Sequence, residues 1–236
     1  MDSATASKLL NLQELDIQIE SLKSEIEKIP AEIEKLKKEI ENIYRKYDEL
    51  KQRKKRLELD KKEKEIDGQT FQEKINKVEL ALNKVKSNEE YKALLREKAQ
   101  AEENIIHLED EILYLMEEIE KTAKEIEDFE KFKEEKIKEL ENEISSLNSK
   151  KTQLEDYLNT LTAQREDLIK TINPKDLSQY ENIKKRVKNK VIAIVDDQVC
   201  TGCYMIIPPK LFTELLKSEK LFTCPNCGRY LFYESK

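Results

Sequence analysis

Residues 15–50, LDIQIESLKSEIEKIPAEIEKLKKEIENIYRKYDEL, decide the fold of this chain of 236 residues. Apolar side chains recur in this stretch in alternating steps of four and three residues. They are Leu15, Ile19, Leu22, Ile26, Ile29, Ile33, Leu36, Ile40, Ile43, Tyr47 and Leu50. Because this spacing keeps one apolar stripe on a single face of an α-helix, it predicts a coiled-coil helix of about five heptads.

A second apolar series follows further along the chain. It comprises Ile105, Leu108, Ile112, Leu115, Ile119, Ile126, Phe129, Ile137, Leu140, Ile144, Leu147, Leu154, Leu158, Leu161, Leu168 and Ile172. The step from Phe129 to Ile137 is one residue longer than a heptad, which predicts a local slip of the seam. Pro30 and Gly68 are the only Pro and Gly before Pro174. We therefore expect residues 1–173 to be almost entirely helical.

Two places compete for the turn between these helices. Ser87 and Glu90 form a capping box near the middle of residues 1–173, which predicts an antiparallel hairpin with its apex at residues 83–91. A turn at Gly68 would leave two helices of very unequal length, so we interpret Gly68 as a break or kink within the first helix.

Pro30 lies inside an unbroken seam and predicts a kink. Residues 145–149 (SSLNS), which would lie opposite Pro30, form helix poorly, and our hypothesis is that both arms bend there.

The four cysteines of the chain form two CxxC pairs near its C-terminal end, Cys200 with Cys203 and Cys224 with Cys227. Two residues between paired cysteines let a tight turn direct both sulfurs at one ion, and two such pairs complete a tetrahedral Zn²⁺ site. Four thiolates leave no open ligand position, so the expected cofactor is structural Zn²⁺. Four thiolates also hold iron, which stays an alternative. A redox CxxC would need a βαβ setting that the sequence does not show, and disulfides would suit a secreted chain with a leader.

The remaining C-terminal sequence predicts a small domain around this site. We expect a short helix over residues 174–186, a strand over 191–195, a helical turn from Pro208 to Leu216 and a closing strand over 230–233. The predicted fold class is therefore mostly α: a long antiparallel coiled-coil helical hairpin, residues 1–173, with a small C-terminal zinc-ribbon domain, residues 174–236. A domain of this size needs its metal to fold.

Composition narrows the protein class further. Charged residues make up 40% of the chain, which has no Trp, so one large globular core is excluded. No apolar run approaches the ~20 residues that cross a bilayer, and the N-terminal residues show no basic and apolar leader, so we expect a cytoplasmic protein without a membrane partner. The chain has no phosphate loop and no nucleophile with a base partner, and we expect no enzyme. His107, the one histidine, has no expected ligand or catalytic role.

Three other motifs accompany the cysteine pairs. They are residues 84–94 (KVKSNEEYKAL), residues 180–183 (YENI), and Pro208 with Pro209 between the two pairs, the second of which continues as CPNCGRYL over 224–231. Together they resemble the bacterial family that joins a long coiled-coil hairpin to a C-terminal four-cysteine zinc ribbon, over nearly the whole chain. The resemblance implies a regulator, since a similar flagellar-biogenesis protein associates with the sigma-54 factor and binds messenger RNA. Residues 188–191 (KNKV) depart from the family, which often has a glycine there.

Two functions follow as hypotheses. The first is a non-enzymatic zinc-binding adaptor or regulatory protein whose coiled coil binds a protein partner near Glu89, Glu90 and Tyr91, while the ribbon supplies a second contact. The resemblance implies a sigma-54, secretion or flagellar component as that partner. A homodimer is also expected as an option, through apolar residues off the main seam. These residues are Tyr114, Met116 and Phe132.

The alternative hypothesis is an RNA- or DNA-binding regulator. Basic residues of the ribbon would contact phosphates, and its aromatic side chains would stack on bases. The basic candidates are Lys184, Lys185, Arg186, Lys188, Lys190 and Arg229, and the aromatic ones are Tyr180, Tyr204, Phe222, Tyr230, Phe232 and Tyr233. The alternative is that most of these aromatic residues form the small core of the ribbon and that the lysines are a solvated face. Residues 174–236 carry a net charge of only about +2 once four thiolates and Zn²⁺ are counted, which is weak for a nucleic-acid surface.

Overall fold

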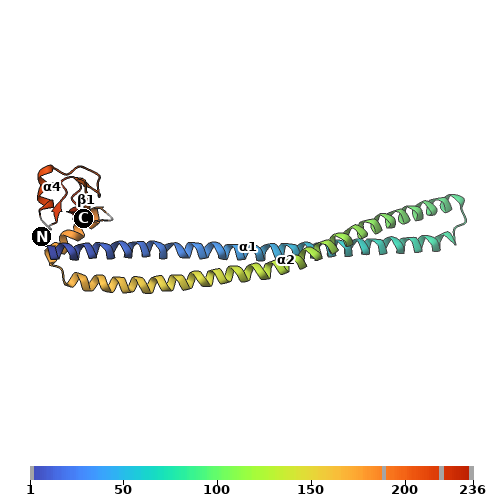
Figure 1. Cartoon of the computed structure of the whole chain (residues 1–236). Coiled ribbons are helices and arrows are strands. Elements are labelled where there is room, and N and C mark those ends of the chain that lie inside the picture. The colour runs from blue at the N-terminus through green and yellow to red at the C-terminus, as the bar shows by residue number, and fades with distance from the viewer. Residues whose placement is uncertain (1–2, 188–189, 218–220, 234–236) are drawn as a thin grey trace. The chain divides into compact units, whose positions relative to one another are not determined.

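The computed structural model describes residues 3–187, 190–217 and 221–233 (Figure 1). In chain order its elements are α1 Ser3–Leu82, α2 Asn88–Lys170, α3 Pro174–Val187, β1 Ile192–Asp196, β2 Val199–Cys200, α4 Pro209–Leu216, β3 Phe222–Thr223 and β4 Tyr230–Phe232. The predicted fold class is confirmed: two long helices precede a small strand region that holds the four cysteines. Within the described ranges, no helix is long and apolar enough to cross a membrane.

The turn between the two long helices lies at the predicted apex. Helix α1 ends at Leu82 and α2 begins at Asn88. The Lys84 N–H donates to the Ala81 carbonyl at 2.9 Å, and the Tyr91 N–H donates to the Ser87 carbonyl at 3.0 Å, which closes the first turn of α2. Helix α1 continues through Gly68, so neither the alternative turn, which the sequence did not favour, nor a break occurs there.

Helix α1 also continues through Pro30, as the unbroken seam predicts. The chain divides into two compact units close to this level: residues 1–33 with 145–236, and residues 34–144. The predicted bend at Pro30 and residues 145–149 stays a prediction, as does the division of the chain at residue 173.

The unit formed by residues 34–144 is held together by the two predicted seams. Ile43 of α1 and Ile137 and Leu140 of α2 are buried in one cluster, and Leu36, Ile40 and Phe129 pack against it. At the site of the predicted slip, the Tyr47 hydroxyl of α1 donates to Glu130 Oε1 of α2 at 2.5 Å. The apolar spacing in the sequence therefore located the contact face of both helices.

The other unit contains a four-stranded sheet with the order β2, β1, β4, β3. Strand β1 pairs antiparallel with β2 and parallel with β4, and β3 pairs antiparallel with β4. The two longest strands, β1 and β4, lie where the sequence predicts strands. The two-residue strands β2 and β3 were not predicted, because each is defined by its partner and not by a local pattern.

The two faces of this sheet belong to different apolar cores, since side chains alternate along a strand. On one face, Ile192 and Tyr230 join a cluster with Leu9 and Leu12 of α1 and Ile183 of α3. On the other face, a second cluster surrounds the cysteines. It contains Ala193, Val195, Cys200, Ile207, Leu215, Cys224 and Leu231. The ribbon therefore shares a core with the first turns of α1, a contact that the sequence analysis did not predict.

Candidate metal centre

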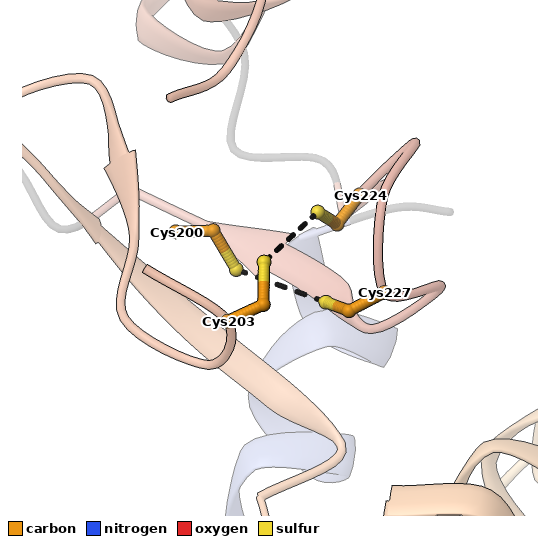
Figure 2. Close-up of side chains that lie close together, drawn as sticks. All are labelled: Cys200, Cys203, Cys224 and Cys227. Atoms are coloured by element: carbon orange, nitrogen blue, oxygen red, sulfur yellow. Dashed lines mark hydrogen bonds between the residues drawn. The ribbon is translucent and has the colours of Figure 1, made fainter. Parts of the chain in front are cut away.

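The four cysteines converge on one point (Figure 2). Their sulfur atoms all lie within 4.8 Å of one another. The distance from Cys200 Sγ to Cys227 Sγ is 3.9 Å, as is that from Cys203 Sγ to Cys224 Sγ. Four ligands at the usual Zn–S distance of about 2.3 Å lie about 3.8 Å apart in a tetrahedron. A disulfide would need about 2.05 Å, so the geometry fits a metal and excludes disulfide pairing.

Each CxxC pair is shaped by hydrogen bonds from the backbone to sulfur. The N–H groups of Gly202 and Cys203 interact with the Cys200 sulfur, and those of Asn226 and Cys227 interact with the Cys224 sulfur. Such bonds favour the thiolate form that a metal ligand needs. Each pair is therefore arranged for ligation by its own backbone.

The thiols differ in their acidity. Burial raises the pKa of Cys200 to about 12 and also raises the pKa of Cys224. Burial likewise opposes ionisation of Cys203, but hydrogen bonds from the Asn226 side chain and the Met205 backbone outweigh it and lower this pKa to about 7. Zn²⁺ must therefore displace protons from the buried thiols, and its binding weakens as the pH falls.

Two glycines let the chain close around the site. A Cβ on Gly202 would lie 2.5 Å from Cδ of Arg229 and 3.1 Å from Cβ of Ala193, so the side chain of Arg229 packs directly on the first CxxC pair. Gly228, after the second pair, has φ +72, which L-residues rarely adopt. Arg186 lies beside Gly228, with its guanidinium within ordinary contact distance of a Cβ there. Arg186 and Arg229 thus place positive charge near a four-thiolate site.

Replacing Gly202 with alanine is expected to loosen this closure. The added methyl group overpacks against Arg229 and Ala193, which should cost about 1 to 3 kcal/mol of ribbon stability. The measurement is the rate at which a chelator removes Zn²⁺, which should rise. Gly68→Ala is the control, because nothing lies within 4 Å of a Cβ there and alanine favours helix. Equal rates in Gly202→Ala and wild type would contradict this role of Gly202.

A buried ionic cluster, which the sequence analysis missed, lies in the same unit. Asp16 of α1 is only 8% exposed. Its Oδ1 accepts from Arg165 Nε at 2.6 Å and lies 2.7 Å from Lys184 Nζ, and its Oδ2 accepts from the Tyr180 hydroxyl at 2.8 Å. Arg165 also bonds Glu181 Oε1 at 2.5 Å. The cluster joins α1, α2 and α3, and its Tyr180 is part of the core that contains Ile192 and Tyr230 of the sheet.

Burial opposes ionisation of Asp16, but its hydrogen bonds from Arg165, Lys184 and Tyr180 outweigh burial and lower the pKa of this carboxyl. Gln13, one turn earlier, binds both backbone groups of Ile192 at the start of β1: its Nε2 donates to the carbonyl at 3.1 Å and its Oε1 accepts from the N–H at 2.5 Å. One signal in the sequence could have revealed Asp16. It lies four residues after Leu12 and three before Ile19, so a charged residue stands on the buried face of the helix.

The predicted nucleic-acid residues lie in different surroundings, and their role stays a prediction. Lys184 is paired with Asp16, and Lys188 lies outside the described residues. Arg229 Nε donates to the Lys190 carbonyl at 3.0 Å. Lys184 and Lys185 line a groove of mixed charge. Its charged residues are Lys28, Lys150, Lys184 and Lys185 with Glu20, Glu25, Glu32 and Glu181.

Most of the aromatic candidates pack in the cores of the protein itself. Tyr180 and Tyr230 are 1% and 5% exposed, and their hydroxyls bond Asp16 and Gln179, so the prediction that they stack on bases is wrong. Phe222 and Tyr233 pack against the core around the cysteines, and Phe232 packs against the core on the other face. Tyr204 is 81% exposed. Of the six, therefore, Tyr204 alone presents most of its ring to solvent.

The partner-binding candidates of the hairpin are accessible. Glu89, Glu90 and Tyr91 are exposed in the first turn of α2. His107 is exposed as well. Tyr114, Met116 and Phe132 lie off the seam and are each at least half exposed.

Comparison with known proteins supports the metal centre. Residues 199–231 match the family described as a C4-type zinc ribbon domain, which includes all four cysteines. Together with the sulfur geometry, this match identifies the site as a zinc ribbon that holds structural Zn²⁺. No curated protein matches the chain.

Three solved structures are similar over almost the full chain. The CT398 protein of Chlamydia trachomatis is 24% identical with a TM-score of 0.83, covering 98% of this chain and 99% of that one. The HP0958 protein of Helicobacter pylori is 27% identical with a TM-score of 0.57, covering 99% and 98%. A protein from Mycobacterium smegmatis is 16% identical with a TM-score of 0.62, covering 99% of each chain. These likenesses support the fold.

Proposed function

We propose that this protein is a non-enzymatic adaptor whose zinc ribbon presents an apolar loop to a protein partner. The observation that carries the proposal is the exposure of three consecutive large apolar side chains, Tyr204, Met205 and Ile206, at 81%, 52% and 75%. They follow directly on the first CxxC pair. Exposed apolar clusters of this kind mark interaction sites.

The metal centre fixes the shape of this loop. The Cys200 N–H donates to the Met205 carbonyl at 3.0 Å, and the Tyr204 N–H donates to the Cys200 carbonyl at 2.7 Å. The backbone of Tyr204, directly after the first CxxC pair, has φ 59, in the left-handed region. A loop held in one conformation loses little entropy on binding, which favours recognition.

The apex of the hairpin offers a second contact in this proposal. Tyr91 is 44% exposed and Leu95, one turn later, is 42% exposed, beside the exposed carboxylates of Glu89 and Glu90. Residues four apart on a helix share a face, so Tyr91 and Leu95 form a small apolar spot with an acidic rim. A transcription or secretion component is the partner class that the sequence resemblance supports, with the sigma-54 factor as the first to test.

The test measures binding of purified sigma-54 factor from the same organism, and co-purification of other partners, with loop and apex variants. Tyr204→Ala with Ile206→Ser is expected to weaken capture at least about tenfold, because exposed aromatic anchors dominate interface energies. Tyr157→Ala, which removes a 51% exposed ring from α2, is the matched control. Zinc content shows that the ribbon is intact. Equal capture of the partner by the double variant and by wild type would contradict the proposal.

RNA binding is the second candidate, supported by the positions of Arg186, Lys190 and Arg229 near the CxxC turns. Phosphate contacts make affinity fall steeply as salt rises. An RNA affinity that drops with salt and with Arg186→Ala would favour this candidate. An affinity independent of both would remove it.

A further inference from the structure

The seam of α1 changes from apolar to largely basic residues in the middle of the unit formed by residues 34–144. Between Leu50 and Phe71 its positions are Lys54, Leu57, Lys61, Lys64 and Gly68. These five are the half-buried residues of the stretch 51–70, so they face α2. Lys64 Nζ lies 2.7 Å from Glu111 of α2. On the α1 side the seam is therefore largely basic over this stretch, whereas α2 keeps half-buried apolar seam residues there, Leu108, Ile112 and Leu115.

Apolar side chains at the same level point away from the seam. On α1, Leu59 and Ile66 are 57% and 53% exposed, and on α2, Ile106 and Leu113 are 59% and 60% exposed. Because α1 places three lysines in the seam while both helices place leucine or isoleucine on their outer faces, this part of the hairpin buries less apolar surface between its own helices. Such a pattern favours a further helical neighbour on the outside.

Each outer face carries a regular stripe. The outer stripe of α1 runs through Gln52, Lys55, Leu59, Lys62 and Ile66, and that of α2 runs through Ile106, Asp110, Leu113, Glu117 and Glu120. All ten residues are exposed. Steps of three and four place each set on one face of its helix. Each stripe thus alternates apolar residues with polar ones, chiefly lysine on α1 and acidic residues on α2.

The two stripes fit each other in antiparallel register. From Ile66 backwards, α1 takes steps of 4, 3, 4 and 3 residues, and from Ile106 forwards α2 takes the same steps. Alignment in this order sets Ile66 against Ile106 and Leu59 against Leu113. It also sets Lys62 against Asp110, Lys55 against Glu117 and Gln52 against Glu120. Apolar residues meet apolar residues, and both lysines meet carboxylates.

We propose that this protein associates with a second copy of itself by packing the outer stripe of α1 on the outer stripe of α2 of the other copy. The two stripes cannot meet within one hairpin, because the seams already face each other there. The wider charge distribution supports this occupant. Residues 51–56 contain five Lys or Arg and no acidic residue, and residues 102–120 contain eight Asp or Glu and no Lys or Arg.

The expected association is reversible. A specific interface buries about 1,200 Å² or more in total, and a contact of about four helical turns falls at the low end of this range. Its charged pairs are exposed, so salt weakens them. We therefore expect an oligomer whose population rises with concentration and falls with ionic strength.

The test exchanges the charges of the two stripes separately. Lys55→Glu with Lys62→Glu, and Asp110→Lys with Glu117→Lys, should each give a monomer in sedimentation velocity, because like charges then face each other. A mixture of the two variants restores opposite charges at every junction, and should associate at least about tenfold more strongly than either variant alone. Lys37→Glu with Lys38→Glu, which makes the same charge change elsewhere on α1, should associate like wild type.

Several outcomes would overturn the proposal. They are a wild type that stays monomeric at every concentration, a mixture that associates no better than its components, and association of the wild type that requires added RNA. The last outcome would assign the lysines to nucleic acid instead. Circular dichroism of each variant verifies that the helices are intact, and the readout does not depend on the adaptor proposal.

Discussion

The Cys224→Ser variant is expected to lose stoichiometric zinc and the ordered ribbon while keeping most of its helix. Cys224 is buried among the apolar residues around the metal, and its sulfur lies 3.9 Å from Cys203 Sγ. Serine neither supplies a thiolate nor fills the same volume. Structural Zn²⁺ contributes roughly 10 to 16 kcal/mol of binding free energy at neutral pH, which exceeds the stability of so small a domain.

The loss of ordered structure should extend from the ribbon to the first turns of α1 but not to residues 34–144. Leu9 and Leu12 of α1 are fully buried against the sheet, so release of the sheet exposes them. Residues 34–144 have their own buried cluster at Ile43, Ile137 and Leu140 and should stay helical. We therefore expect hydrogen exchange to accelerate in the ribbon and in the first turns of α1, but not around Ile43.

Elemental analysis and hydrogen exchange by mass spectrometry check this expectation. Thr223→Ser is the control, because it makes a small change at an exposed neighbour of Cys224. Zinc bound at wild-type stoichiometry in Cys224→Ser, or a ribbon that remains protected without metal, would contradict a structural role for the ion.

The parts of this fold that could be predicted from sequence depend on local periodicity and fixed spacing. A seam such as that from Leu15 to Leu50 requires only that apolar residues recur on one helical face, and the CxxC pairs carry their geometry within four residues. The apex could be predicted for the same reason, since the capping signal at Ser87 and Glu90 is contained in four residues.

The parts that could not be predicted depend on contacts between distant segments. Gln13 binds Ile192 across 179 positions of sequence, and Asp16 meets Tyr180 across 164. Tyr180 and Lys184 therefore seemed available for nucleic acid, although both are engaged by Asp16. The sequence shows the residue types but not that α3 and the sheet pack on the N-terminal turns of α1.

Asp16→Asn is expected to destabilise the unit that contains the ribbon by about 2 to 3 kcal/mol at neutral pH. The substitution removes the negative charge that Arg165 and Lys184 share, and leaves two cations close together at a mostly buried position. Breaking a fully buried ion pair costs about 3 to 5 kcal/mol. Arg165 keeps Glu181 as a partner and Lys184 is 33% exposed, so the loss should be smaller.

The effect has a defined pH dependence. Because the folded protein lowers the pKa of Asp16 below its ordinary value of 3.8, its stabilising contribution is present above that value and is lost as the pH falls through the folded pKa. Wild type and Asp16→Asn should therefore differ at neutral pH and converge in strong acid. Zinc leaves both proteins in acid, so the difference between them isolates the carboxyl group.

Hydrogen exchange in α3 and β1 at neutral pH, and urea unfolding across a pH series, give the two readouts. Asp167→Asn is the matched control: Asp167 is 76% exposed and bonds the exposed Lys170, one turn away, at 2.8 Å, so its loss should cost at most about 0.5 kcal/mol. If Asp16→Asn were no worse than this control, the cluster would contribute nothing to the attachment of the ribbon. The attachment would then rest on the apolar contacts of Leu9 and Leu12 and on the hydrogen bonds of Gln13.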